Sequence, residues 1–193
     1  MEMPTSYLRC EWEILQEIGE LQNIESFPFK KKTPFSYSFS LPGKKGKGAV
    51  VFEDNTDLVH NQFIRIPPAF LLYKTDKVYI LGYAINSSTQ QGLQATPHLY
   101  FQIMKTVLEV VRDFLDKNQN SFILFYETPR LGRKVGPKFN HYVEILNKHI
   151  PSEYVQTGVE IGDINGIIFG PYRKWKPKEK EKLLFDPYTG EHV

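Results

Sequence analysis

The chain has 193 residues, of which 41% are apolar and 14% aromatic, and its 24 basic and 22 acidic side chains leave a net charge of +2. This length suits one domain with a large core, and the apolar content excludes a disordered chain. The small net charge excludes a protein-wide field that would attract nucleic acid or an anionic membrane, so any charge argument has to be local.

Cysteine and apolar usage predict a cytoplasmic setting. Cys10 is the only cysteine, so no internal disulfide and no cysteine-based zinc site can form within one chain. The longest apolar stretches are strand-sized, well short of the roughly 20 residues of a membrane-spanning helix. The first residues lack both the basic start and the apolar run of a secretory signal. We therefore expect a cytoplasmic protein with no membrane partner.

An amphipathic helix is predicted over about residues 5–25, because apolar residues recur there at spacings of three and four with glutamates mostly between them. Its apolar side chains are Leu8, Trp12, Leu15, Ile18 and Leu21. Residues 30–34, with three consecutive lysines, break this pattern, and from Phe35 the apolar period changes to two. Residues 35–53 therefore predict a β-hairpin whose turn, residues 42–48, is rich in lysine and glycine.

Residues 78–85 form the next predicted strand, and a polar loop follows it. Thr96 and Pro97 then supply an N-cap and a first helical position, and the apolar spacing beyond them predicts a long helix over residues 97–117. A buried strand is predicted over residues 122–127. The glycine-containing loop after it is basic.

A second helix is predicted over about residues 137–149, and strands over residues 154–161 and 166–172. The order of elements predicts an α+β fold: a mixed, mostly antiparallel sheet with two central helices in an acetyltransferase-like order, plus the N-terminal helix. We expect one domain over residues 1–172 and a charged C-terminal tail over residues 173–193. The apolar cluster in this tail suits docking in a groove, either on its own domain or on a partner.

The succession of strand, loop, long helix, strand, helix and two strands from residue 78 onward resembles the second half of the GCN5-related N-acetyltransferase fold. The resemblance implies acetyl-coenzyme A as cofactor, held through its pyrophosphate by backbone N–H groups in a loop of the pattern Gln/Arg-x-x-Gly-x-Gly/Ala. Gly92 matches the central glycine, and Gln91, Gly92 and Gln94 form the candidate coenzyme loop. Thr89 replaces the leading Gln or Arg and Gln94 replaces the final small residue, so one position of the pattern is matched.

The chain is also similar to a bacterial family of small uncharacterised proteins, in which a strand, a long helix, an aromatic strand and a second helix after a basic loop follow one another. The segments that carry this resemblance are residues 79–83, 97–117, 123–126 and 130–142. The similarity supports the α+β fold and implies no mechanism.

Basic residues in two loops form a candidate site for an anion or an acidic partner. Positive side chains and glycines at the start of a helix suit a phosphate, because backbone donors and the helix dipole act together with the side chains. The candidates are Arg130, Arg133, Lys134 and Lys138 in the loop before the second helix, and Lys44, Lys45 and Lys47 in the hairpin turn. They form one site only if the fold brings the two loops together.

The sequence predicts no catalytic residue and no metal site. Its histidines lack metal-binding spacings. Glu53, Asp54 and Asp57 are interpreted as solvated turn acids rather than metal ligands. An acetyltransferase would use a tyrosine late in the fold as general acid, for which Tyr154 and Tyr172 are the candidates that the resemblance implies.

The sequence favours a non-catalytic protein-interaction module without a cofactor, such as an accessory protein or an antitoxin, immunity or defence-system component. One alternative is an acyl-coenzyme-A-dependent N-acetyltransferase using the loop around Gly92, which an open V-shaped cleft beside the strand at residues 78–85 would support. The other is a nucleic-acid or nucleotide binder, which requires the two basic loops to share one face.

Overall fold

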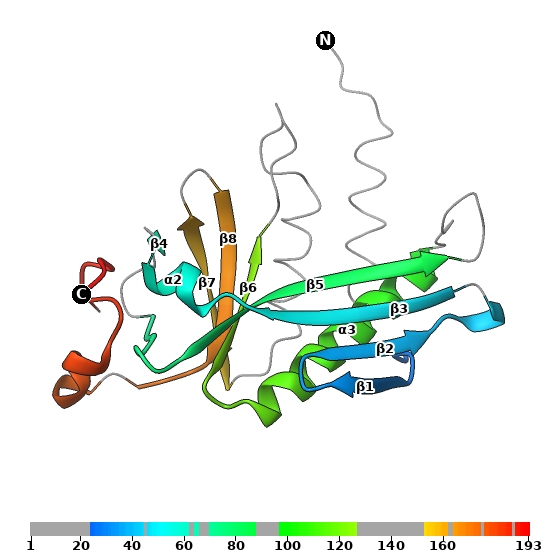
Figure 1. Cartoon of the computed structure of the whole chain (residues 1–193), viewed down its shortest axis with the longest axis horizontal. Helices are drawn as coiled ribbons and strands as arrows, with labels where there is room; N and C mark the ends of the chain where they lie inside the picture. The colour runs from blue at the N-terminus through cyan, green and yellow to red at the C-terminus, as the bar shows by residue number, and fades with distance from the viewer. Residues whose placement is uncertain are drawn as a thin grey trace, which may run out of the picture.

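The computed structural model describes residues 24–44, 46–61, 64–65, 70–87, 97–126, 153–161, 164–174, 176–186 and 188–193. These residues form an α+β fold around one eight-stranded sheet, which is mostly antiparallel as the sequence predicts (Figure 1). The sheet order is β1-β2-β3-β5-β6-β8-β7-β4. Among the described strands, only β5 and β6 pair in parallel.

The strands are β1 (Phe29–Thr33), β2 (Ser36–Ser40), β3 (Gly46–Asp54), β4 (Ile64–Arg65), β5 (Lys77–Ser87), β6 (Ser121–Tyr126), β7 (Tyr154–Ile161) and β8 (Ile164–Pro171). The helices are α2 (Thr56–Asn61) and α3 (Pro97–Lys117), with 3-10 helices η2 (Pro42–Lys44) and η3 (Pro177–Lys182). The predicted hairpin, the strand at residues 78–85, the long helix and the last two strands are confirmed. The helix predicted over residues 137–149, and that over residues 5–25 up to residue 23, lie outside the described residues.

Two elements differ from the sequence-based expectation. The lysines of residues 30–32 belong to β1, an edge strand that pairs antiparallel with β2. Their side chains are exposed, so the segment carries no apolar period that would reveal a strand, and lysines on an edge also discourage pairing with another chain. The second is α2, whose six residues are too few for a helical period to be visible.

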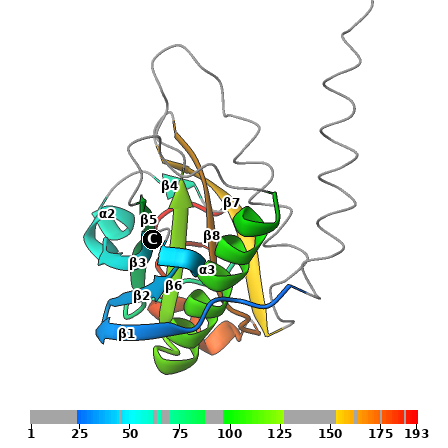
Figure 2. The same ribbon diagram turned by 90° about the vertical axis from the view of Figure 1, so that its right-hand side faces the viewer.

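One face of the sheet is covered by α3, as Figure 2 shows. Tyr37, Val50 and Phe52 from the hairpin and Tyr79 from β5 are buried against the apolar stripe of α3. At the start of this layer, the Phe27 N–H donates to Thr106 Oγ1 on α3 at 2.8 Å. No helix in the described part of the chain is long and apolar enough to cross a membrane.

The other face is covered by α2, the segment around Leu72, and Leu184 and Phe185 of the C-terminal segment, which begins at Arg173. These side chains bury Val78 of β5 and Phe122 of β6. The Leu184 N–H donates to the Leu72 carbonyl at 2.8 Å, so the C-terminal segment docks on its own domain. It lies beside α2 in Figure 1, where His192 Nε2 is 2.9 Å from the His60 carbonyl oxygen.

A buried ion pair ties the start of the C-terminal segment to the turn before β5. The guanidinium of Arg173 donates to both carboxylate oxygens of Asp76, at 2.8 Å from Nη2 to Oδ1. The Tyr73 N–H also donates to Asp76, at 2.7 Å. The guanidinium lies over the rings of Tyr73 and Phe122, at 4.6 and 5.1 Å from their centroids.

Gly170 in β8 is required because the ring of Phe122 occupies the place of a side chain. A Cβ at this position would lie 2.3 Å from Phe122 Cδ1, and that ring is fully buried and cannot move aside. We expect Gly170→Ala to lower the free energy of unfolding by about 1–3 kcal/mol. Gly82→Ala is the matched control in urea unfolding, because its Cβ would meet nothing closer than 3.9 Å. Equal effects of the two substitutions would contradict the packing.

Candidate functional site

The sheet divides between its two parallel strands. β5 and β6 pair at four successive positions, from Lys77 with Ser121 to Ile80 with Leu124. Beyond these positions β5 continues to Ser87 paired with β3, and β6 continues to Tyr126 paired with β8. We call the region between these diverging ends, residues 81–87 and 125–126, the fork. In Figure 1 β5 runs horizontally and β6 upward from their shared start.

The fork follows from the way each strand is packed. Leu81 and Ile85 of β5 join the core under α3, together with the hairpin. Leu124 of β6 instead joins the core on the opposite face, with β7 and β8. Because β5 follows β3 as far as Ser87 and β6 follows β8 as far as Tyr126, and neighbouring strands twist relative to one another, the parallel ladder between them ends after four pairs.

Over the fork the ladder between β5 and β6 has ended, while the ladder between β5 and β3 continues. A strand exposes N–H and C=O groups alternately to its two sides, and over residues 81–87 the side toward β3 is paired. These groups are strong hydrogen-bonding sites that need a partner, whether water, protein or ligand. An extended ligand that carries amide groups can supply such a partner.

The first turn of α3 lies at the open end of the fork. Phe114, near the C-terminal end of α3, packs against Tyr79 near the start of β5, with ring centroids 5.1 Å apart. The helix therefore runs back along β5, and its first residue, Pro97, is near the end of that strand. The connection contains residues 88–96, so the candidate coenzyme residues Gln91, Gly92 and Gln94 lie outside the described residues.

Lys47 is the one candidate anion-binding side chain that the structure describes. It is exposed on β3 and pairs in register with Asn86, next to the end of β5, so the lysine-rich turn borders the open end of the fork. Lys45 and the side chain of Lys44 lie outside the described residues, as do the candidates of the second basic loop, Arg130, Arg133, Lys134 and Lys138. Convergence of the two basic loops therefore stays a prediction.

Tyr154 and Tyr172 lie at the wrong end of α3 to act as a general acid in the fork. The Tyr154 hydroxyl donates to Asp116 Oδ1 at 2.9 Å, about 28 Å along the helix from Pro97. Burial and this hydrogen bond raise the pKa of Tyr154 to about 12, which makes it a weaker acid. The Tyr172 N–H donates to the Glu153 carbonyl at 2.8 Å, which places that residue near the same end.

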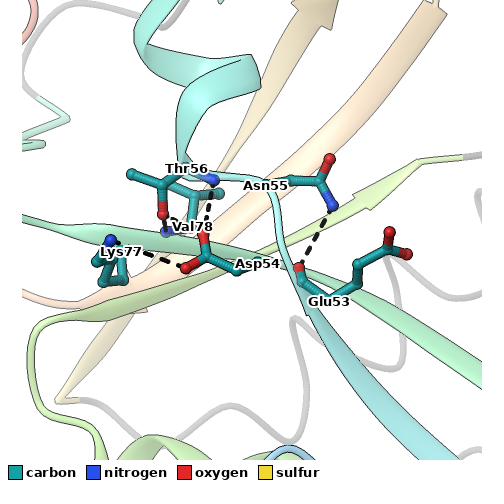
Figure 3. Close-up of polar contacts among 6 residues, drawn as sticks. All are labelled: Glu53, Asp54, Asn55, Thr56, Lys77 and Val78. Atoms are coloured by element: carbon teal, nitrogen blue, oxygen red, sulfur yellow. Dashed lines mark hydrogen bonds and ion pairs between the residues drawn. The ribbon is translucent and has the colours of Figure 1, made fainter.

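Asp54, the last residue of β3, has a structural role, which Figure 3 shows. Asp54 Oδ1 accepts the Thr56 N–H at 3.0 Å, at the start of α2, and Thr56 Oγ1 in turn accepts the Val78 N–H at 3.1 Å. Burial opposes ionisation of Asp54, but the hydrogen bonds from Thr56 and the charge of Lys77 lower its pKa. Among the described residues, no three histidine, cysteine or carboxylate side chains are grouped as metal ligands would be.

Sequence reasoning missed the fork because strand pairing is a long-range property. Gly82 and Ala84, which are small residues in an otherwise apolar strand, were the one local signal of an unusual environment. Comparison with protein-family models finds no match to this chain, and neither the curated proteins nor the solved structures give one.

Proposed function

We propose that the chain is an acetyltransferase-like protein that binds an acyl-coenzyme A in the fork between β5 and β6. The observation that carries this proposal is the end of the parallel ladder at Ile80 and Leu124 while β5 continues to Ser87. The pantetheine arm of coenzyme A is an extended chain with amide groups, which can lie along β5 beyond Ile80 as a neighbouring strand would.

The order of the described elements supports the acetyltransferase-like scaffold. A parallel β5–α3–β6 unit follows an antiparallel hairpin, and β8 lies between β6 and β7. The connection between β5 and α3 would then hold the pyrophosphate near Gly92. Backbone N–H groups and the positive end of a helix are suited to that role. The proposal concerns coenzyme binding and assigns no catalytic residue.

A protein-interaction role and nucleic-acid binding, which the sequence also suggests, rest on other parts of the molecule. The first is supported by an exposed face of the sheet centred on Val51, which is 46% exposed. The second would require Lys47 and the basic loop around Arg130 to share a surface, and it predicts binding that weakens steeply with salt.

Ligand-dependent thermal unfolding tests the proposed function. We expect acetyl-coenzyme A to raise Tm, because a ligand that binds only the folded state stabilises it. Gln91→Glu should weaken binding roughly fivefold or more, since it places a negative charge beside the coenzyme pyrophosphate. Gln119→Glu is the matched control: it adds the same charge in the exposed turn beyond the far end of α3 and should leave the Tm shift unchanged.

Two outcomes would contradict coenzyme binding in the fork. One is an unchanged Tm at millimolar acetyl-coenzyme A. The other is a shift that Gln91→Glu and Gln119→Glu reduce equally, which would indicate a general charge effect. A rise in Tm with a short oligonucleotide in place of the coenzyme would instead support the nucleic-acid alternative.

A further inference from the structure

One row of side chains on β3 points away from α3 and from the core that α3 covers. Burial alternates along the strand: Val50 and Phe52 face α3, whereas Lys47, Val51 and Glu53 are exposed on the other side and Ala49 is half-buried there. We call Lys47, Ala49, Val51 and Glu53 the outer row. Val51 is 46% exposed in the middle of a four-strand region of the sheet.

Small residues flank the outer row on both neighbouring strands. By register, Val51 lies between Ser36 of β2 and Gly82 of β5, and Ala49 lies between Ser38 and Ala84. None of these neighbours rises above the row, so the face is flat and Val51 projects from it. Neither α2 nor α3 covers this area, since α3 lies on the opposite face and α2 packs on the part of the sheet around Val78.

We propose that this face binds a second copy of the same chain, with the two sheets packed face to face about a two-fold axis that lies between them, perpendicular to β3 and level with Val50. Such an axis makes the two copies of β3 antiparallel and places each outer-row residue opposite a different one. Lys47 then faces Glu53 of the second copy, and Ala49 faces Val51 of the second copy. Each contact occurs twice, as two-fold symmetry requires.

The outer row is complementary to itself in charge and in size. Lys47 and Glu53 each lie three residues from Val50, on opposite sides of it. The smaller Ala49 and the larger Val51 lie between them, one on each side of Val50. Within the described part of the chain, neither Lys47 nor Glu53 forms an ion pair. A second copy supplies the partner of each charge and a flat surface against Val51, which argues for this chain itself as the occupant.

The size of the face predicts a weak dimer. Four strands spaced by about 4.8 Å and seven residues rising about 3.3 Å each give a face of roughly 19 by 23 Å on each copy. The total buried area is therefore roughly 900 Å², at the lower limit for specific association. Lys30 of β1 lies at the rim of this face, where its ammonium group stays in solvent. We expect association that depends on concentration in the micromolar range.

Sedimentation velocity of the full chain over a range of concentrations, with charge-reversal variants, tests the proposal. Lys47→Glu and Glu53→Lys each replace two attractive contacts by two repulsive ones, so each should weaken the dimer about tenfold or more. The double variant Lys47→Glu/Glu53→Lys restores opposite charges in the same places and should recover the wild-type dissociation constant within about twofold. Lys178→Glu is the control for the change in net charge, because Lys178 is exposed on η3.

Circular dichroism checks the folding of each variant. We expect folding to be retained, because Lys47, Glu53 and Lys178 are exposed. A wild-type chain that stays monomeric up to several hundred micromolar would overturn the proposal. So would a dimer that Lys47→Glu leaves intact, or one that the double variant fails to restore, since either result places the contact elsewhere. Val51→Lys gives an independent check and should abolish dimerisation without unfolding the chain.

Discussion

Replacing Asp76 by alanine is expected to lower the free energy of unfolding by about 3–5 kcal/mol. Its carboxylate is only 1% exposed and accepts hydrogen bonds from the Arg173 guanidinium and the Tyr73 N–H. Without it, the guanidinium remains between the rings of Tyr73 and Phe122 with its charge unpaired. The buried Tyr73 N–H loses its acceptor as well, which adds to the loss.

The same substitution should loosen the C-terminal segment before the whole domain unfolds. Arg173 is the first residue of that segment, and its ion pair precedes the docked residues Leu183 and Leu184. Urea unfolding followed by circular dichroism measures the stability, and limited proteolysis followed by mass spectrometry locates the loosened part. Asp57→Ala, at an exposed position of α2, is the control and should cost less than about 1 kcal/mol. A loss below 1 kcal/mol for Asp76→Ala would show that the ion pair contributes little.

Phe114→Ala is expected to destabilise the fold by about 3–5 kcal/mol, because it removes a fully buried ring from the contact between α3 and the sheet. The ring stacks on Phe52 of β3 with centroids 3.9 Å apart and meets Tyr79 of β5 edge to face. The surrounding strands are held by their hydrogen-bonded ladders and cannot close the cavity. Calorimetry should therefore show a Tm lower by well over 5 °C.

Phe35→Ala is the matched control for this prediction. Phe35 touches the same cluster, with its centroid 6.5 Å from that of Phe114, but it is 43% exposed in the turn between β1 and β2. Phe35→Ala should lower the free energy of unfolding by about 1 kcal/mol, because Phe35 removes less apolar surface from water on folding than Phe114 does. If Phe35→Ala and Phe114→Ala lowered the free energy of unfolding equally, burial against α3 would not dominate the stability of this layer.

Elements whose side chains alternate between core and solvent could be predicted from the sequence. The period of two over residues 36–40, and the broad stripe over residues 97–117, record which face each element buries. The same reasoning failed for β1, because an edge strand can satisfy its backbone while all of its lysines face water. The spacing of apolar residues reflects which side chains are buried. A strand or helix that buries few side chains therefore shows no regular apolar spacing in the sequence.

Pairs of residues distant in the chain were beyond the reach of sequence reasoning. Asp76 and Arg173 are 97 residues apart in the chain, yet they form a buried ion pair. Gly170 leaves room for the ring of Phe122, which belongs to a different strand. In each case the partner is set by which strands become neighbours, and no local pattern encodes that choice.

The sequence by itself determined the α+β class, the long helix and most of the strands, because these follow from local spacing and from the burial of one face. Only the tertiary structure decided the strand order, the fork beside β5 and the exposed outer row on β3. The physical reason is that strand pairing joins segments far apart in the chain: β5 pairs with β3 as far as Ser87, while β6 pairs with β8 as far as Tyr126. The local spacing of residues does not record which strands become neighbours or where a ladder between them ends.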